Sequence, residues 1–301
     1  MNLYTHQDSN IWKTWVLMTL FFSLIIALGW AISLFYNDVT ILYIAVFVAI
    51  FANIFSYWFS DKIVLRIHKA KPVTREEYFN LWNATENLSI TAGLPMPRLF
   101  IVEDSAPNAF ATGRNKEHAV VCVTTGLLQI LDKNELEGVI AHELSHIGNR
   151  DMLLSTVVVV MAGFVALLSD LFLRSQVWGS GRSRNNNAGA FLLLIGLVLA
   201  ILTPLAATFI RLAISRKREF LADASGALLT RYPEGLASAL KKISLTSTPM
   251  RSANRATAHL FISNPFGTSK TSKLTKLFLT HPPVEERIRA LLPDKYIIKE
   301  S

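Results

Sequence analysis

Two long stretches without a charged residue constrain this chain more than any other feature. Residues 14–37 and 39–60 contain no Asp, Glu, Lys or Arg, and each exceeds the roughly 20 residues that a helix needs to cross the hydrocarbon core of a bilayer. Asn37 and Asp38 interrupt the two stretches, so the pattern predicts a transmembrane helical hairpin. The composition agrees, because charged residues make up only 17% of the chain, below the roughly 25% of soluble domains.

Two further apolar stretches, 152–173 and 188–210, predict a second pair of spans. Four spans place both termini and both long polar stretches on one side of the membrane. Lys and Arg gather at the span ends on that shared side, whereas the other side has only Arg174, Arg182 and Arg184. The positive-inside rule therefore predicts that the termini and the polar stretches are cytoplasmic. The net charge of +8 is explained by topology and lipid headgroups, and a nucleic-acid partner is not expected.

These stretches divide the chain into four parts: an N-terminal hairpin (1–60), a first polar part (61–151), a second transmembrane pair (152–210) and a second polar part (211–301). In the first polar part we predict a helix continuing to Thr91, then strands over 98–102, 108–112 and 119–124. Asp132, with Glu135 three residues later, predicts the start of a helix at Lys133. We expect that helix to run through Asp151 straight into the third span.

The residues at 142–146, His-Glu-Leu-Ser-His, carry the clearest chemistry. On a helix His142 and His146 lie one turn apart on the same face, so both imidazoles can bind one metal ion. Glu143 points about 100° away from His142. There it can take a proton from a water molecule at the metal and later give it to a leaving amine. The motif predicts a zinc hydrolase, against the alternatives of a surface histidine pair or a decayed site.

A tetrahedral zinc site of this kind needs a third protein ligand. Five residues are candidates: Cys122, Glu219, Asp223, His259 and His281. Cys122 lies in an apolar strand pattern, where a lone cysteine is usually a core residue. Glu219 and Asp223 are four residues apart on one helix face, so Glu219 could complete the set while Asp223 hydrogen-bonds the other ring nitrogen of His142. The alternative is that Glu219 only pairs with the basic residues that precede it.

The ordered set of motifs resembles the HtpX-type heat-shock membrane metalloproteases, within the HtpX/Ste24 group of gluzincins. The resemblance covers nearly the whole chain and rests on residues 108–113 (NAFATG), 141–147 (AHELSHI), 149–151 (NRD), 215–223 (SRKREFLAD) and 280–283 (THPP). It implies one zinc ion (Zn2+) per chain with Glu219 as the third ligand. It also implies endoproteolysis of misfolded or surplus membrane proteins in quality control and the stress response.

The resemblance implies further roles that spacing alone does not give. His281 would face the active site and stabilise the oxyanion of the tetrahedral intermediate, and Arg287 would support the same wall. Residues 108–112 resemble an edge strand to which an extended substrate adds by backbone hydrogen bonds; they are Asn108, Ala109, Phe110, Ala111 and Thr112. The alternative for His281 is a surface residue that caps the following helix. The alternative for residues 108–112 is an ordinary hairpin strand.

We therefore expect an α-helical multi-pass membrane protein with a cytoplasmic zincin-like α+β metalloprotease domain assembled from 61–151 and 211–301. Membrane-protein substrates and the lipid bilayer are the expected partners, and self-association is left open. The ligands lie close to span ends, so we expect cleavage in cytoplasmic segments of a substrate. One rival is another zinc hydrolase, deformylase-like, with Cys122 as ligand, which gives no reason for four spans. The other is a membrane holdase or scaffold with structural zinc, which would not need Glu143.

Overall fold

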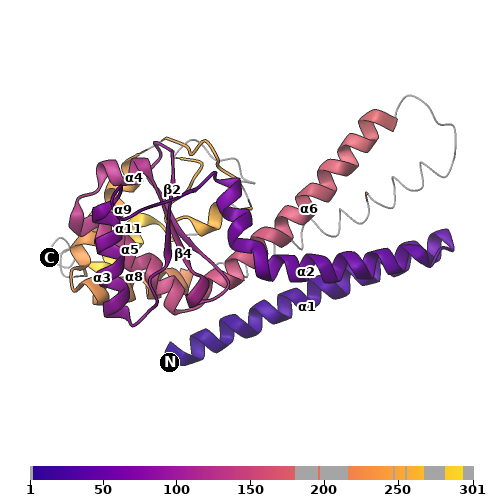
Figure 1. Cartoon of the computed structure of the whole chain (residues 1–301), viewed down its shortest axis with the longest axis horizontal. Helices are drawn as coiled ribbons and strands as arrows, with labels where there is room; N and C mark the ends of the chain where they lie inside the picture. The colour runs from indigo at the N-terminus through magenta and orange to yellow at the C-terminus, as the bar shows by residue number, and fades with distance from the viewer. Residues whose placement is uncertain are drawn as a thin grey trace.

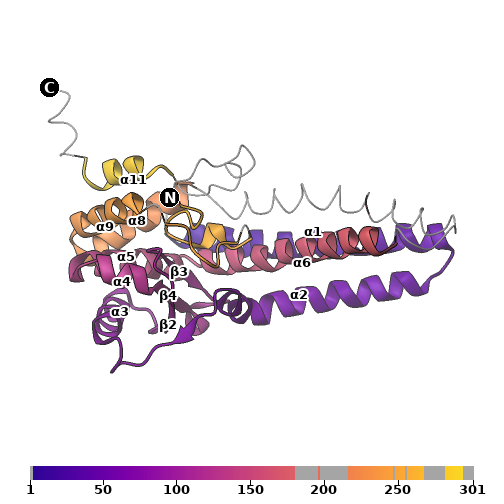
Figure 2. The same ribbon diagram turned by 90° about the horizontal axis from the view of Figure 1, so that it is seen from above.

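The computed structural model describes residues 3–179, 196, 216–246, 248–254, 256–267 and 282–293. Three long helices, together called the rod below, extend from one end of a mixed α/β domain; α1 and α2 run side by side, and α6 diverges from them away from the domain (Figures 1 and 2). The predicted fourth span over 188–210 lies outside the described residues apart from Gly196, and so does His281.

The rod contains α1 (Leu3–Tyr36), α2 (Thr40–Ile67) and α6 (Asp151–Gly179), each packed against the other two. A turn at Asn37, whose φ is 51°, separates α1 from α2 as predicted. Leu17, Phe21, Leu154 and Val158 belong to the apolar core between α1 and α6. Two segments, Asn10–Leu34 and Thr40–Ile67, are long and apolar enough to cross a membrane on their own, and α5 (Lys133–Gly148) and the start of α6 qualify only as a bent pair.

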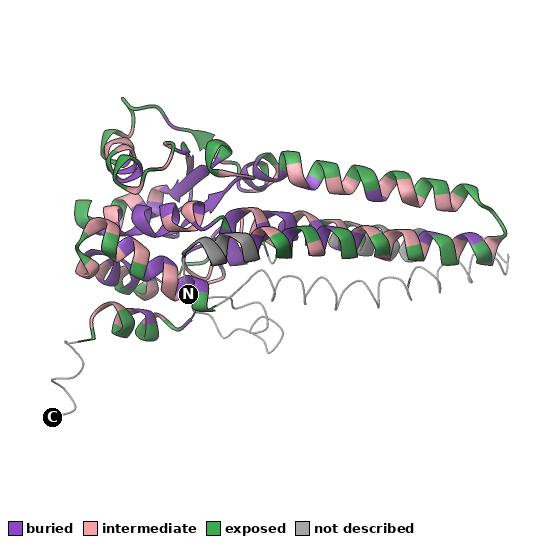
Figure 3. Cartoon of the chain, turned by 90° about the horizontal axis from the view of Figure 1, so that it is seen from below, coloured by how far each residue is buried: buried purple, intermediate pink, exposed green. Residues whose placement is uncertain are grey.

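One face of α2 presents a row of aromatic rings to the outside. Phe47, Phe51, Phe55 and Phe59 stack at successive helical turns, with ring centroids 5.0–6.3 Å apart, and Phe47 is 69% exposed. The exposed outer face of the rod can be followed along its length in Figure 3. A continuous exposed apolar surface is unusual in a soluble protein, whereas it suits a helix that faces lipid.

The domain is built on a mixed sheet whose described strands have the order β1-β2-β4-β3. These strands are β1 (Lys71–Pro72), β2 (Arg98–Val102), β3 (Ala109–Thr112) and β4 (Val120–Thr124). Only β2 and β4 run parallel, and β3 pairs antiparallel with β4 at the edge of the sheet. The other helices among the described residues are α3 (Phe79–Ala92), α4 (Thr125–Ile130), α5, α8 (Arg216–Thr230), α9 (Pro233–Leu245) and α11 (Val284–Leu291), with short 3-10 turns at Lys116–His118 and Ala258–Leu260.

Helix α5 lies at the centre of the domain. It contacts the edge strand β3 and is surrounded by α3, α8 and α9. Its buried face, which includes Val139, Ile140 and Leu144, packs with Val121 of β4 and Leu240 of α9 in one apolar core. The histidine helix is therefore held on several sides by rigid elements.

The predicted continuation of the second span to Thr91 is wrong. Helix α2 ends at Ile67, because Lys69 adopts a positive φ of 51° and the chain then enters β1. Pro72 lies in that strand, and proline disrupts a helix interior. The N–H of Val73 donates to the carbonyl of Leu99 at 3.0 Å, so pairing with the sheet replaces the helix.

The prediction that the histidine helix runs straight into the third span is also wrong. Helix α5 ends at Gly148, α6 begins at Asp151, and the two bend by 82°. Arg150 makes the turn with a φ of 57°. The bend turns Asp151 back towards His146.

Candidate metal centre

Helix α5 presents the two histidines from a firmly anchored segment. Asp132 and Glu135 form the predicted capping box at its start, each side chain accepting a hydrogen bond from the other's backbone N–H. His142 and His146 follow on the same face, with their rings at 89° and 4.8 Å apart. Their Nε2 atoms are separated by 3.2 Å, so both rings direct Nε2 towards the same position, where one metal ion could bind.

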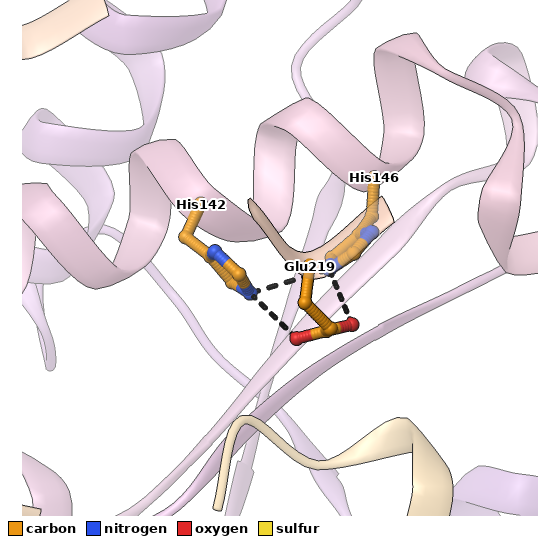
Figure 4. A group of neighbouring side chains, drawn as sticks. All are labelled: His142, His146 and Glu219. Carbon is orange, nitrogen blue, oxygen red and sulfur yellow. Dashed lines mark hydrogen bonds and ion pairs between the residues drawn. The ribbon is translucent and has the colours of Figure 1, made fainter. Parts of the chain in front are cut away.

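Helix α8 brings Glu219 to that point from the other half of the chain (Figure 4). The Glu219 carboxylate oxygens lie 3.9 Å from Nε2 of His142 and 3.7 Å from Nε2 of His146. The structure thus brings together the three residues predicted as ligands, and their ligand atoms all lie within 4.8 Å of one another.

The spacing of these three donors fits a zinc ion. Zinc bonds of about 2.0–2.2 Å in tetrahedral geometry place neighbouring ligand atoms roughly 3.4 Å apart. The observed separations of 3.2, 3.7 and 3.9 Å lie close to that value. Two imidazoles and one carboxylate are also the donor set of the His₂Glu catalytic zinc sites.

Asp223 and Arg287 fix the orientation of His142. The Nδ1 of His142 lies 2.9 Å from Asp223, the contact predicted for Asp223. Arg287 donates two hydrogen bonds to the Asp223 carboxylate, at 2.6 and 2.8 Å, and a third to the carbonyl of Ile262 at 3.2 Å. All three side chains of this chain of contacts are buried, so the ring of His142 has little freedom to turn.

The ionisation of this pair suits metal binding. Burial would raise the pKa of Asp223, but the hydrogen bonds and charge of Arg287 outweigh it and lower that pKa to about 2. Burial lowers the pKa of His142 to about 4. A neutral His142 that donates from Nδ1 to an ionised Asp223 leaves the lone pair of Nε2 available to a metal.

Asp151 holds His146 in the same way, and the sequence interpretation assigned it no such role. Its Oδ2 lies 3.1 Å from Nδ1 of His146. Burial would lower the pKa of His146, but the hydrogen bond to Asp151 and the charge of Glu219 outweigh it and raise that pKa to about 9. Unlike His142, His146 therefore carries a proton in the absence of metal and would release it on metal binding. An acid five residues after the second histidine is a usable sequence signal, but only a bend in the helix lets it reach back.

Glu143 is buried beside the cluster, with 2% of its surface exposed. Burial raises the pKa of its carboxyl group to about 7, with the charge of Glu219 also raising it. The backbone of Ala111 on β3 lies near the same carboxyl group and opposes this rise in pKa. Glu143 therefore lies between the metal-ligand helix and the edge strand, as an acid that acts on water and peptide at this site requires.

The outer edge of β3 is already paired over part of its length. Phe110 and Phe261 form an antiparallel bridge, and the N–H of Ile262 donates to the carbonyl of Ala109 at 2.9 Å. The side-chain amide of Asn108 donates to the carbonyl of Ser263 at 3.0 Å and accepts from its N–H at 3.2 Å. The predicted substrate strand is thus an edge strand whose Asn108 end holds a segment of the same chain.

Two of the other ligand candidates, Cys122 and His259, do not join the cluster. Cys122 is fully buried in β4, and burial raises the pKa of its thiol far above the ordinary range. His259 lies with its Nε2 3.1 Å from the carbonyl of Ser155. Among the described residues the group that could hold a metal contains only His142, His146 and Glu219, so the deformylase-like reading lacks its cysteine ligand.

The two histidines lie on a helix that contacts the edge strand of a mixed sheet, and Glu143 follows the first of them. A second helix supplies the carboxylate ligand. Together these features define a metallopeptidase. The model of peptidase family M48 matches residues 79–294. The chain belongs to this family.

Relatives extend the match over the whole chain. A protein named Protease HtpX homolog from Caldanaerobacter subterraneus subsp. tengcongensis is 49% identical over 295 residues, which cover 96% of this chain and 97% of the relative. Another of that name, from Thermoanaerobacter pseudethanolicus, is 50% identical over the same shares. The crystal structure of S. mikatae Ste24p aligns with a TM-score of 0.51 and 19% identity, over 96% of this chain and 67% of that one, and shows the common fold. The chain is a membrane-associated metalloprotease.

Proposed function

We propose that this protein is a zinc endopeptidase that cleaves misfolded or surplus membrane proteins on their cytoplasmic side, in membrane quality control and the stress response. One observation carries the proposal: Glu143 is buried beside a cluster of His142, His146 and Glu219. A structural metal site does not need that acid, so its position favours turnover over a holdase or scaffold.

His142, His146 and Glu219 would hold the zinc ion. When bound, it would polarise the carbonyl of a peptide bond and make a water molecule more acidic. Asp223 and Asp151 keep the two rings in the required tautomer and orientation through their Nδ1 atoms. Glu143 accepts a proton from the attacking water at its carboxylate and returns it to the nitrogen of the leaving amine. His281 is our proposed donor to the oxyanion.

The substrate would bind as an extended strand along the part of β3 nearest Glu143. Ala109 already accepts a hydrogen bond from Ile262, which leaves the Ala111 end for backbone pairing with a peptide. Ala111 also lies near Glu143, whose pKa it lowers. A peptide held there would have its backbone next to the acid that acts on it.

The location proposed is the bacterial inner membrane, with four spans and a cytoplasmic peptidase domain. The distribution of Lys and Arg around the apolar stretches supports this orientation. The domain lies at one end of the helical rod (Figure 2), so a substrate segment would have to leave the bilayer to reach Glu143.

Mapping of cleavage products tests the proposal. Purified protein and a single-span substrate would be placed together in liposomes, and the products identified by mass spectrometry, with Glu143→Gln as the control. We expect Glu143-dependent cuts in the substrate's cytoplasmic juxtamembrane segment. Cuts mainly at the centre of the apolar span would contradict the proposed site of action.

A further inference from the structure

A polar residue of the first long helix reaches the metal centre. Asn10 of α1 is only 3% exposed, although it lies at the start of a segment apolar enough to span a membrane. Its side-chain amide donates to Asp151 Oδ1 at 2.6 Å and to the carbonyl of Asn149 at 3.2 Å. Its Oδ1 accepts from Arg218 at 3.2 Å.

Two partners of Asn10 lie at the α5–α6 bend, and the third lies on α8, which carries Glu219. Asp151 bonds His146 through its other carboxylate oxygen, and Asn149 caps the end of the histidine helix α5. Arg218 directly precedes Glu219 on α8, and it also lies 3.6 Å from Asp151 Oδ1. One amide therefore links the α5–α6 bend to the segment that carries the third ligand.

The chemistry of this position is specific to an amide. Asp151 and the Asn149 carbonyl offer only acceptors, whereas Arg218 offers only donors. A side chain that meets both must donate and accept within one short planar group, as asparagine does. An apolar residue would remove these hydrogen bonds from buried groups, and a carboxylate would face Asp151 with a like charge.

We propose that Asn10 is a positioning residue of the metal centre, which makes docking of α1 a condition for tight zinc binding. Asn10 acts through Asp151 on His146 and through Arg218 on the segment of Glu219. In this account α1 is a part of the peptidase as well as an anchor. The proposal rests on zinc being the ion of the proposed function.

The test measures zinc affinity of the purified full-length chain in detergent, by competition with a chelator. Asn10→Asp keeps the size of the side chain and the acceptor for Arg218, but it removes both donated bonds. We expect its zinc dissociation constant to rise about 10- to 100-fold, the usual effect of removing a partner of a ligating histidine. Thr14→Val is the matched control, because Thr14 is buried one turn along the same helix and bonds the Asn10 carbonyl within it.

Exchange of the two side chains separates positioning from a general loss of folding. The double variant Asn10→Asp with Asp151→Asn restores one amide and one carboxylate across the contact. We expect it to bind zinc at least several-fold more tightly than Asn10→Asp alone. Wild-type affinity in Asn10→Asp, or an exchanged pair no better than the single variant, would overturn the proposal. A wild type that binds no zinc would instead refute the proposed function, so the two failures are distinct.

Discussion

At the scale of single residues, the hydrogen bonds of Arg287 require an arginine side chain. Its guanidinium bonds both oxygens of Asp223 and the Ile262 carbonyl, and a lysine cannot reproduce this planar, forked arrangement. We predict that Arg287→Lys weakens zinc binding about 10-fold or more, measured by chelator competition. Arg289→Lys, at an exposed position two residues later on the same helix, should bind like wild type. Equal affinities would show that Asp223 holds His142 without help.

His68 should make the stability of the fold depend on pH. It follows α2, is buried, and has hydroxyl partners in Ser252 and Thr257, each at 3.0 Å. Burial lowers its pKa to about 4, although the charge of Asp104 opposes this. The unfolded chain, with a histidine pKa near 6.5, binds the proton first, so stability is full above that pH and is lost as pH falls towards 4.

The predicted loss from His68 is about 2 kcal/mol between pH 8 and pH 5. Chemical unfolding of the wild type and of His68→Gln in detergent at several pH values would measure it. The variant is expected to be less stable at pH 8 but to show a flatter dependence between pH 6.5 and 4. Parallel pH curves would mean that another group is responsible.

Some site residues could be predicted from local spacing and others could not. The four-residue spacing of Glu219 and Asp223 placed both acids on one helix face, and the family resemblance then assigned Glu219 to the metal. Asp151 required the 82° bend at Arg150, which has no clear local signal, because Asn-Arg-Asp is compatible with a continuing helix. The role of Asn10 could not be predicted for a different reason: its partners are at least 139 positions away in the sequence.

At the scale of elements, the approach of α8 to α5 sets the ligand geometry. Gly226 allows this close approach, since a Cβ there would lie 3.0 Å from the backbone nitrogen of His142 and 3.2 Å from two neighbouring backbone atoms of α5. We predict that Gly226→Ala pushes the helices apart by a few tenths of an ångström, weakens zinc binding and costs roughly 1 kcal/mol of stability. Zinc titration and thermal unfolding would measure both effects.

Gly163→Ala is the control for that substitution. Gly163 lies in α6, where a Cβ would meet nothing within 4 Å, so the change should leave zinc binding intact and be neutral or slightly stabilising. An unchanged zinc affinity in Gly226→Ala would show that α5 and α8 adjust without moving the ligands.

The elements that follow local rules were predicted well, whereas those created by tertiary contacts were not. The strands predicted over 98–102, 108–112 and 119–124 correspond to β2, β3 and β4, because breaker residues and β-branched runs are local signals. The capping box of α5 is local too. Strand β1 has only two residues and forms because it pairs with β2, so its own sequence does not predict it.

For the whole molecule, we predict which side of the membrane each end of the rod faces. Asp38 and Lys116 are both exposed, one in the turn between α1 and α2 and the other in the domain. Single cysteines introduced by Asp38→Cys or Lys116→Cys, in a Cys122→Ala background, should react with an impermeant maleimide from opposite sides of membrane vesicles. The label should reach position 116 only from the cytoplasmic side. Reaction of both from one side would refute the proposed topology.

The most direct test of the central claim combines zinc content with turnover in Glu143→Gln. We predict that the purified variant retains one zinc per chain, because its ligands His142, His146 and Glu219 are untouched. Its cleavage of a membrane-protein substrate should fall by about 10²- to 10⁴-fold, the usual contribution of a general base, and a chelator should abolish the activity of the wild type. Cleavage by Glu143→Gln at the wild-type rate, with zinc bound, would contradict the account.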